Sequence, residues 1–147
     1  MTTATQHRHQ LTDPAAVRTY IEGGHGKITL VSTKSGARIT YSLKRADARE
    51  GQRPEDVPLW VAVLGGADHF RHLGRLWPDL RWTPSRAVDS EAKSVLAFEW
   101  LTGALRAGRV PTTVEVWHEG VCCRCGRTLT VPESIASGIG PTCAGRL

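Results

Sequence analysis

The 147-residue sequence has little of what marks exported or membrane-bound proteins. No apolar run approaches the roughly 18 residues that a membrane-spanning helix needs. Residues 1–10 also lack the apolar stretch of a secretory signal. Cysteine is absent before position 122, so no disulfide framework is spread along the chain. We therefore expect an intracellular, cytoplasmic protein without membrane contact.

Signatures of enzyme catalysis are also missing. The acidic residues are scattered, and the sequence contains neither a nucleophile elbow nor a metal-hydrolase helix motif. The glycine-rich stretch 23–26 follows a helical pattern, whereas a phosphate-binding loop follows a strand and precedes a helix. We expect a protein that is not an enzyme and predict no catalytic residues.

The residues that are present suffice for one folded domain with a small addition. Hydrophobic residues make up 40% and charged residues 22% of the chain, which are ordinary values for a globular protein. Residues 1–12 are polar, and we expect a disordered tail there. The rest divides into a body over 13–117 and a C-terminal module over 118–147.

Apolar periodicity predicts the elements of the body. Asp13–Pro14 is typical of a helix start, and two alternating runs around Lys34–Gly36 are typical of a β-hairpin. In chain order we expect a helix from Pro14 to the stop at Gly23, strands over 27–33, 38–43 and 59–64, one or two strands within 69–86, a helix over 89–107 and a strand over 113–117. The apolar run 59–64 predicts a strand buried on both faces. The fold class is α+β, with a mostly antiparallel sheet packed by one long helix.

The long helix has an expected N-cap at Asp89 or Ser90 and ends before Gly108. At about 100° per residue its apolar side chains form one stripe, which we expect to face the core. This stripe contains Ala97, Phe98, Trp100, Leu101, Ala104 and Leu105. The opposite, solvent side is expected to carry Glu91, Glu99, Thr102 and Arg106.

Basic residues outnumber acidic ones by 19 to 14, which gives a net charge of +5. They are concentrated in residues 34–53 and in residues 69–86, where aromatic residues lie between them. Arginine beside aromatic rings on a sheet supplies the phosphate neutralisation and stacking that single-stranded nucleic acid requires. The candidate nucleic-acid-binding residues are Arg38, Lys44, Arg45, Arg71, Arg75, Trp77, Arg81, Trp82 and Arg86. In the alternative interpretation, Trp77 and Trp82 belong to the core and the arginines are solvated or paired.

All four cysteines lie in the C-terminal module. Cys122 and Cys125 have the spacing of a zinc knuckle, in which two thiolates two residues apart face one ion. The following Gly126 frees the turn so that backbone amides can point at the sulfur atoms. Cys143 follows a Gly-Pro pair near the expected start of a last short helix, whose positive end favours a thiolate.

Zinc requires a fourth ligand, and His118 is the best candidate. It lies at the end of a predicted strand, on the same face as Val114 and Val116. The predicted site for a structural Zn²⁺ ion is His118, Cys122, Cys125 and Cys143. Such a saturated site has no open position for catalysis.

Other interpretations of these residues stay open. The three spaced cysteines could be buried thiols or a redox pair, although no thioredoxin-like unit is visible. Cys123 is expected to be a packing or exposed thiol, with ligation in place of Cys122 as the alternative. His69 and His72, beside Asp68, could form a second metal site on a helix, but the glycines around them argue against a helix there.

The C-terminal module resembles a known family. The string Cys-x-x-Cys-Gly-Arg-x-Leu-Thr-x-Pro-Glu-Ser-Ile-x-x-Gly-Ile-Gly-Pro-x-Cys-Ala, which starts at Cys122, is similar to a small uncharacterised zinc-finger-like domain. That family is common in phage proteins and in their bacterial, often actinobacterial, relatives. The resemblance implies a metal-binding module and a phage protein acting in the host cytoplasm, but no activity. Cys123 departs from the family's pattern.

These features predict a small zinc-binding protein that associates with DNA or RNA through the basic and aromatic surface of its body. The charge of the C-terminal module is too low for a DNA-reading finger, so zinc is expected to be structural. The alternative is an interaction module that binds a host protein as a takeover or anti-defence factor.

Overall fold

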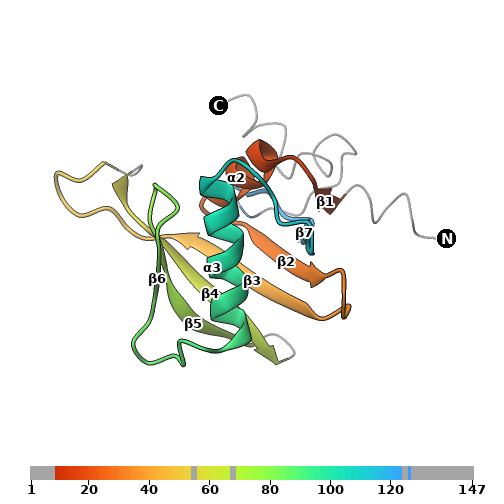
Figure 1. The fold of residues 1–147 in the computed structure, drawn as a ribbon. Helices are drawn as coiled ribbons and strands as arrows, with labels where there is room; N and C mark the ends of the chain where they lie inside the picture. Colours follow the sequence, from red (N-terminus) through yellow and green to blue (C-terminus); the bar gives the residue numbers. More distant parts are fainter. Residues whose placement is uncertain (1–8, 54–55, 67–68, 124–125, 127–147) are drawn as a thin grey trace.

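The computed structural model describes residues 9–53, 56–66, 69–123 and 126. Within these ranges one seven-stranded antiparallel sheet has the order β1-β7-β2-β3-β4-β5-β6 (Figure 1). Its strands are β1 (Gln10–Leu11), β2 (Lys27–Ser32), β3 (Arg38–Arg45), β4 (Leu59–Gly66), β5 (His69–Leu76), β6 (Trp82–Pro84) and β7 (Val114–His118). The helices are α2 (Pro14–Glu22) and α3 (Lys93–Arg106). The prediction of an α+β fold with an antiparallel sheet is confirmed for the described residues.

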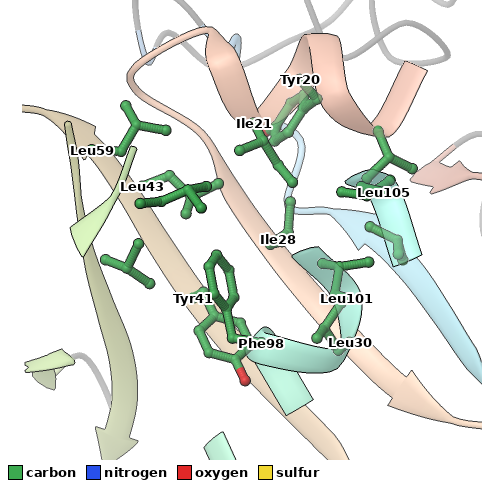
Figure 2. Packing of buried hydrophobic residues seen from close by; sticks show 14 of the residues in the cluster. Tyr20, Ile21, Ile28, Leu30, Tyr41, Leu43, Leu59, Phe98, Leu101 and Leu105 are labelled. Atoms are coloured by element: carbon green, nitrogen blue, oxygen red, sulfur yellow. The ribbon is translucent and has the colours of Figure 1, made fainter. Parts of the chain in front are cut away.

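Both helices pack against the same face of the sheet. Alternate residues of the central strands point to this face, as the two-residue period of a strand requires. Figure 2 shows Ile28, Tyr41 and Leu43 from the sheet among residues of α2 and α3. The Tyr41 ring lies 5.0 Å from the Phe98 ring of α3, and its hydroxyl donates to the Ser94 carbonyl at 2.6 Å. We call the other side of the sheet the open face.

Several elements lie where the sequence predicts them. The short helix runs from Pro14 to Glu22, and the hairpin of β2 and β3 joins the two alternating runs. Asp13 occupies the N-cap position, where its carbonyl accepts from the Val17 N–H at 3.0 Å. Two strands, β5 and β6, lie within 69–86 as expected. Residues 1–8 lie outside the described part, but Gln10 and Leu11 pair with β7 and thus join the sheet.

The prediction that the 59–64 strand is buried on both faces was wrong. Leu59 and Val61 are buried under the helices, but Trp60 is 42% and Leu64 37% exposed on the open face. An antiparallel sheet can leave one face to solvent, so a continuous apolar run does not guarantee cover on both sides.

Two predictions for the long helix were also wrong. The helix starts at Lys93 with Ala92 at the N-cap position, and the Asp89 carboxylate accepts from the Glu91 N–H at 3.0 Å within a preceding turn. Trp100 is 51% exposed, whereas Thr102 is fully buried. The Thr102 hydroxyl donates to the carbonyls of Phe98 and Glu99, both at 3.1 Å, so its burial leaves no polar group unpaired.

No helix of the described residues is long and apolar enough to cross a membrane.

Candidate functional site

His118 ends β7 with its side chain on the helix-covered face, as the sequence predicts. The residue is fully buried and is the register partner of Ile28. Its ring stacks on His9 with centroids 4.8 Å apart and on Tyr20 of α2 with centroids 5.4 Å apart. The Gly120 N–H donates to Nδ1 of His118 at 3.1 Å. These contacts hold the imidazole in one orientation, which is what a metal ligand requires.

Tyr20 connects this histidine to the chain that follows it. Its hydroxyl donates to the carbonyls of Val121, at 3.0 Å, and Lys27, at 3.2 Å. Burial raises the pKa of Tyr20 above its ordinary value, so the phenol is neutral and remains a donor. The segment after β7 is therefore bound to α2 and to the start of β2.

Two of the four predicted metal ligands lie in the described residues. Cys122 is fully buried, and its carbonyl accepts from the Gly126 N–H at 2.9 Å. Gly126 has φ +76°, the left-handed conformation that favours glycine, as expected at the end of a knuckle turn. Cys125 and Cys143 lie outside the described residues. Within the described ranges, no three His, Cys, Asp or Glu side chains form a group that could hold a metal.

Cys123 packs against the end of α2. Its carbonyl accepts from the His25 N–H at 2.7 Å. A Cβ atom built on Gly23 would lie 2.6 Å from the Cys123 Sγ and 2.5 Å from its carbonyl oxygen. Cys123 is 1% exposed, so it fills the space over Gly23 as a packing residue.

The open face carries a cluster of tryptophan and arginine side chains. Lys44, Trp60 and Arg75 are register partners on the adjacent strands β3, β4 and β5. The Arg75 guanidinium lies 6.0 Å from the Trp60 ring and 5.5 Å from the Trp77 ring. A second guanidinium, that of Arg81, lies 5.3 Å from the Trp77 ring. We call these five residues the Trp60 cluster.

Side chains from non-adjacent strands meet on the open face. The Lys27 ammonium group on β2 lies 5.5 Å from the ring of Phe70 on β5. Two strands separate β2 from β5, which corresponds to roughly 14 Å across a flat sheet. The two long side chains therefore lean toward each other across the open face.

A groove of about 870 Å³ adjoins the Trp60 cluster. Trp60, Arg75 and Trp77 form its sheet side, and the loop between β3 and β4 forms the other side. The loop brings Arg49 and Arg53, but also acidic residues, and Arg53 is paired with Asp56 at 2.9 Å. The groove thus combines stacking surface with charges of both signs.

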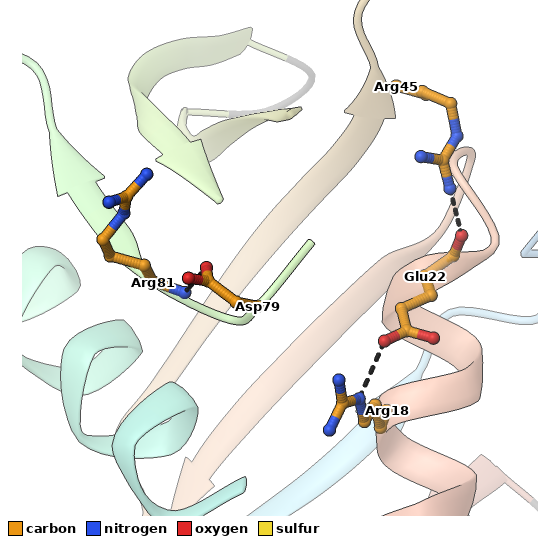
Figure 3. A network of polar contacts seen from close by, with 5 residues as sticks. All are labelled: Arg18, Glu22, Arg45, Asp79 and Arg81. Carbon is orange, nitrogen blue, oxygen red and sulfur yellow. Dashed lines mark hydrogen bonds and ion pairs between the residues drawn. The ribbon is translucent and has the colours of Figure 1, made fainter. Parts of the chain in front are cut away.

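The other predicted nucleic-acid residues are spread around the molecule. Arg38 is exposed at the far end of β3, while Arg71 and Arg86 are exposed on β5 and after β6. The Arg45 guanidinium donates to the Glu22 carbonyl at the end of α2, and Figure 3 shows this contact. The Trp82 ring packs 4.8 Å from Phe98 on the helix-covered side, in agreement with the core alternative.

Trp60 is the site residue that the sequence did not single out. It lies within an apolar run, where its outward direction becomes visible only from the strand register. The T-shaped contact between Trp60 and His72, with ring centroids 5.5 Å apart, also places that histidine on the open face. His69 and His72 lie on a strand rather than a helix, so the spacing proposed for a second metal does not apply.

Comparisons with known proteins concern the C-terminal part of the chain. Neither the curated proteins nor the solved structures gave a match. A family model described as a family of unknown function (DUF6011) matches residues 115–147, a segment that begins inside β7 and contains all four proposed metal ligands.

Proposed function

We propose that this protein is a small, non-enzymatic binder of single-stranded nucleic acid, with a structural zinc ion in its C-terminal module. The carrying observation is the Trp60 cluster, in which the Arg75 guanidinium lies near two indole rings on the exposed face of the sheet. The resemblance of the C-terminal module to a phage-associated family makes a phage protein in the host cytoplasm part of this proposal.

The chemistry of the cluster suits single strands. The exposed ring of Trp60 offers a face on which a base can stack, and stacking tolerates any sequence because every base has a π-face. Lys44 and Arg75 flank Trp60 on the adjacent strands and can neutralise the phosphates of a bound strand. Bases in a duplex are already stacked, so single strands should bind more tightly than duplexes.

The zinc site of the proposal consists of His118, Cys122, Cys125 and Cys143. The buried, oriented imidazole and the left-handed Gly126 support it. When bound, the ion would cross-link the C-terminal module to β7. The Nδ1 atom of His118 accepts from Gly120, so ligation through Nδ1 would replace this hydrogen bond.

Binding can be tested by fluorescence anisotropy with labelled oligothymidylate, oligouridylate and a duplex control over a range of salt concentrations. The affinity for single strands should fall steeply with salt. Trp60→Ala should weaken it about 5- to 150-fold, which corresponds to the loss of about 1–3 kcal/mol of stacking. Trp100→Ala, which removes a ring from α3 on the other side of the sheet, is the matched control. The proposal fails if no binding occurs at low salt or if Trp60→Ala binds as tightly as the wild type.

The zinc part has a separate test. Metal analysis should find about one zinc per chain, and Cys125→Ser or Cys143→Ser should remove it. Full zinc occupancy in both variants would show that the ligands are assigned wrongly. Replacement of His118 should weaken zinc binding more than replacement of Cys123, and the reverse result would make Cys123 the ligand.

A further inference from the structure

The outer side of α3 carries two large apolar side chains. Leu96 is 49% exposed and Trp100, one turn later, is 51% exposed. Neither belongs to the core that α3 forms with the sheet. Single exposed apolar residues are common, but these two are neighbours on the helix, and Trp100 lines a hollow in the surface.

The hollow is a groove of about 410 Å³ between α3 and the hairpin of β2 and β3. Trp100 and Ala97 line its helix side, while Leu30, Ile39 and Val114 line its sheet side. The surface of the groove is therefore mostly apolar, with a large aromatic ring at one wall. A ligand that fits it must itself present apolar side chains.

The charged groups of this groove are all of one sign among the described residues. Lys34 and Lys93, two of the four lysines in the chain, line it, and no Asp or Glu does. In addition, α3 begins at Lys93 without a side-chain N-cap or an acidic residue in its first turn. The positive end of the helix dipole thus lies beside Lys93 without compensation from its own helix.

We infer that this groove docks an acidic, amphipathic peptide segment of a partner protein. Leucine or aromatic side chains of the segment would contact Trp100 and the apolar wall, and its carboxylates would face Lys34 and Lys93. The groove lies on the helix-covered side of the sheet, opposite the Trp60 cluster. The protein can therefore hold a nucleic acid and a protein partner at the same time.

Two other occupants fit the groove less well. Nucleic acid would find two cations on a mostly apolar surface, whereas phosphate binding requires a positive track. A second copy of the chain in a symmetric dimer would bring the same patch onto itself, which doubles the number of lysines in the contact and adds no carboxylate from the groove lining. The charge of the groove thus favours an acidic partner segment.

The test is a selection of displayed random peptides of about 12 residues on the full-length protein. Peptides that combine Asp or Glu with Leu, Phe or Trp should be enriched. Individual selected peptides should bind at least about tenfold more weakly to Trp100→Ala and to Lys93→Glu. Trp60→Ala, on the open face, should bind them as the wild type does.

Trp100 is half exposed, so its variant should keep the circular dichroism spectrum and unfolding midpoint of the wild type. Failure of any acidic peptide to be enriched would overturn the proposal, as would equal binding of selected peptides by Trp100→Ala. A concentration-dependent dimer that Trp100→Ala abolishes would also overturn it, because the groove would then be covered by a second copy.

Discussion

At the scale of single residues, Leu80 shows how the core can impose an unfavourable backbone conformation. It lies in the turn between β5 and β6, where its N–H donates to the Trp77 carbonyl at 2.8 Å. Its φ of 67° is in the left-handed region, which costs a non-glycine residue about 1–2 kcal/mol. The side chain is 1% exposed, so its burial offsets this cost.

The left-handed conformation of Leu80 predicts an unusual order of stability among variants at position 80. Leu80→Ala and Leu80→Gly should both lose about 2–5 kcal/mol of stability through the cavity that they leave. The glycine variant should be the more stable of the two by about 1 kcal/mol, since glycine relieves the left-handed strain. Urea denaturation measures both. Ala104→Gly inside α3 is the control, and there glycine should cost about 1 kcal/mol. An alanine variant more stable than the glycine variant would contradict the left-handed turn.

Gly23 and Gly36 show two different reasons why a position requires glycine: lack of space for a side chain and a left-handed backbone conformation. Gly23 has an ordinary φ of −63°, but a Cβ there would meet the Cys123 carbonyl oxygen at 2.5 Å. Gly36 has φ +74° and no atom within 4 Å of its Cβ position. Gly36→Ala should lower the free energy of unfolding by about 1 kcal/mol, because alanine is strained in the left-handed conformation. Gly23→Ala should lower it by about 2–3 kcal/mol, because the added methyl group overlaps the Cys123 carbonyl.

Chemical labelling distinguishes the two glycine variants further. Gly23→Ala must displace the Cys123 segment, so the Cys123 thiol should be alkylated faster than in the wild type. Gly36→Ala should leave the alkylation rate unchanged. Mass spectrometry of proteolytic peptides measures both rates, and equal rates in the three proteins would show that Cys123 does not lie on Gly23.

Tyr41 makes stability depend on alkaline pH. Burial raises its pKa above the ordinary value of 10, so the folded state keeps the phenol neutral while the unfolded state ionises. Its contribution to stability is complete below pH 10 and is lost as the pH rises above 10. The stability of Tyr41→Phe does not decrease in this way, because phenylalanine cannot ionise. The variant also loses the hydrogen bond to the Ser94 carbonyl, which contributes about 1 kcal/mol.

The stability of the wild type relative to Tyr41→Phe should therefore fall by about 1.4 kcal/mol between pH 8 and pH 11, which is enough to cancel its advantage of about 1 kcal/mol from the hydrogen bond. Urea denaturation of both proteins at each pH provides the measurement. The other ionisable groups are common to both proteins and cancel in the comparison. A gap that stays constant with pH would mean that Tyr41 ionises equally in both states.

At the scale of elements, local sequence signals predicted most of the fold. The Pro14 start of α2 and the alternating runs of β2 and β3 were correct, because they depend on neighbours along the chain. The predictions of which side chains of α3 and β4 are buried were partly wrong, since burial depends on where the core lies. Trp100 faces outward and Thr102 inward, and no hydrophobicity scale anticipates a hydroxyl that is satisfied within its own helix.

The position of β7 predicts what removal of the proposed zinc would do. His118 lies between β2 and α2, and Tyr20 binds the next residues of the chain. Chelation should therefore speed amide hydrogen exchange in β7 and α2, and not only in residues 127–147. Cys123→Ala should keep this response to chelation, whereas His118→Ala should lose it. Faster exchange confined to 127–147 would show that the ion does not stabilise the sheet.

At the scale of the whole molecule, the sequence predicted the residue types of the candidate nucleic-acid surface but not which of these residues lie together. Composition identified arginine and tryptophan, and Arg75, Trp77 and Arg81 do lie together. Trp60 belongs to the cluster because strand pairing places it beside Arg75, whereas Trp82 packs against Phe98 in the core. Both assignments depend on which face each strand presents, and this follows from the register of the full sheet.

The sheet order also decides how the C-terminal module can be separated from the body. β7 is an interior strand between β1 and β2, and Val116 is fully buried. A chain that ends at Thr113 should therefore fail to fold, because β1 and one edge of β2 lose the strand that pairs with them and the core is left open. A chain that ends at Gly126 keeps β7 and the packing of Cys123 on Gly23, and it should fold without a response to zinc. Circular dichroism and urea unfolding test both chains. Cooperative unfolding of the shorter chain would mean that the body is complete without β7.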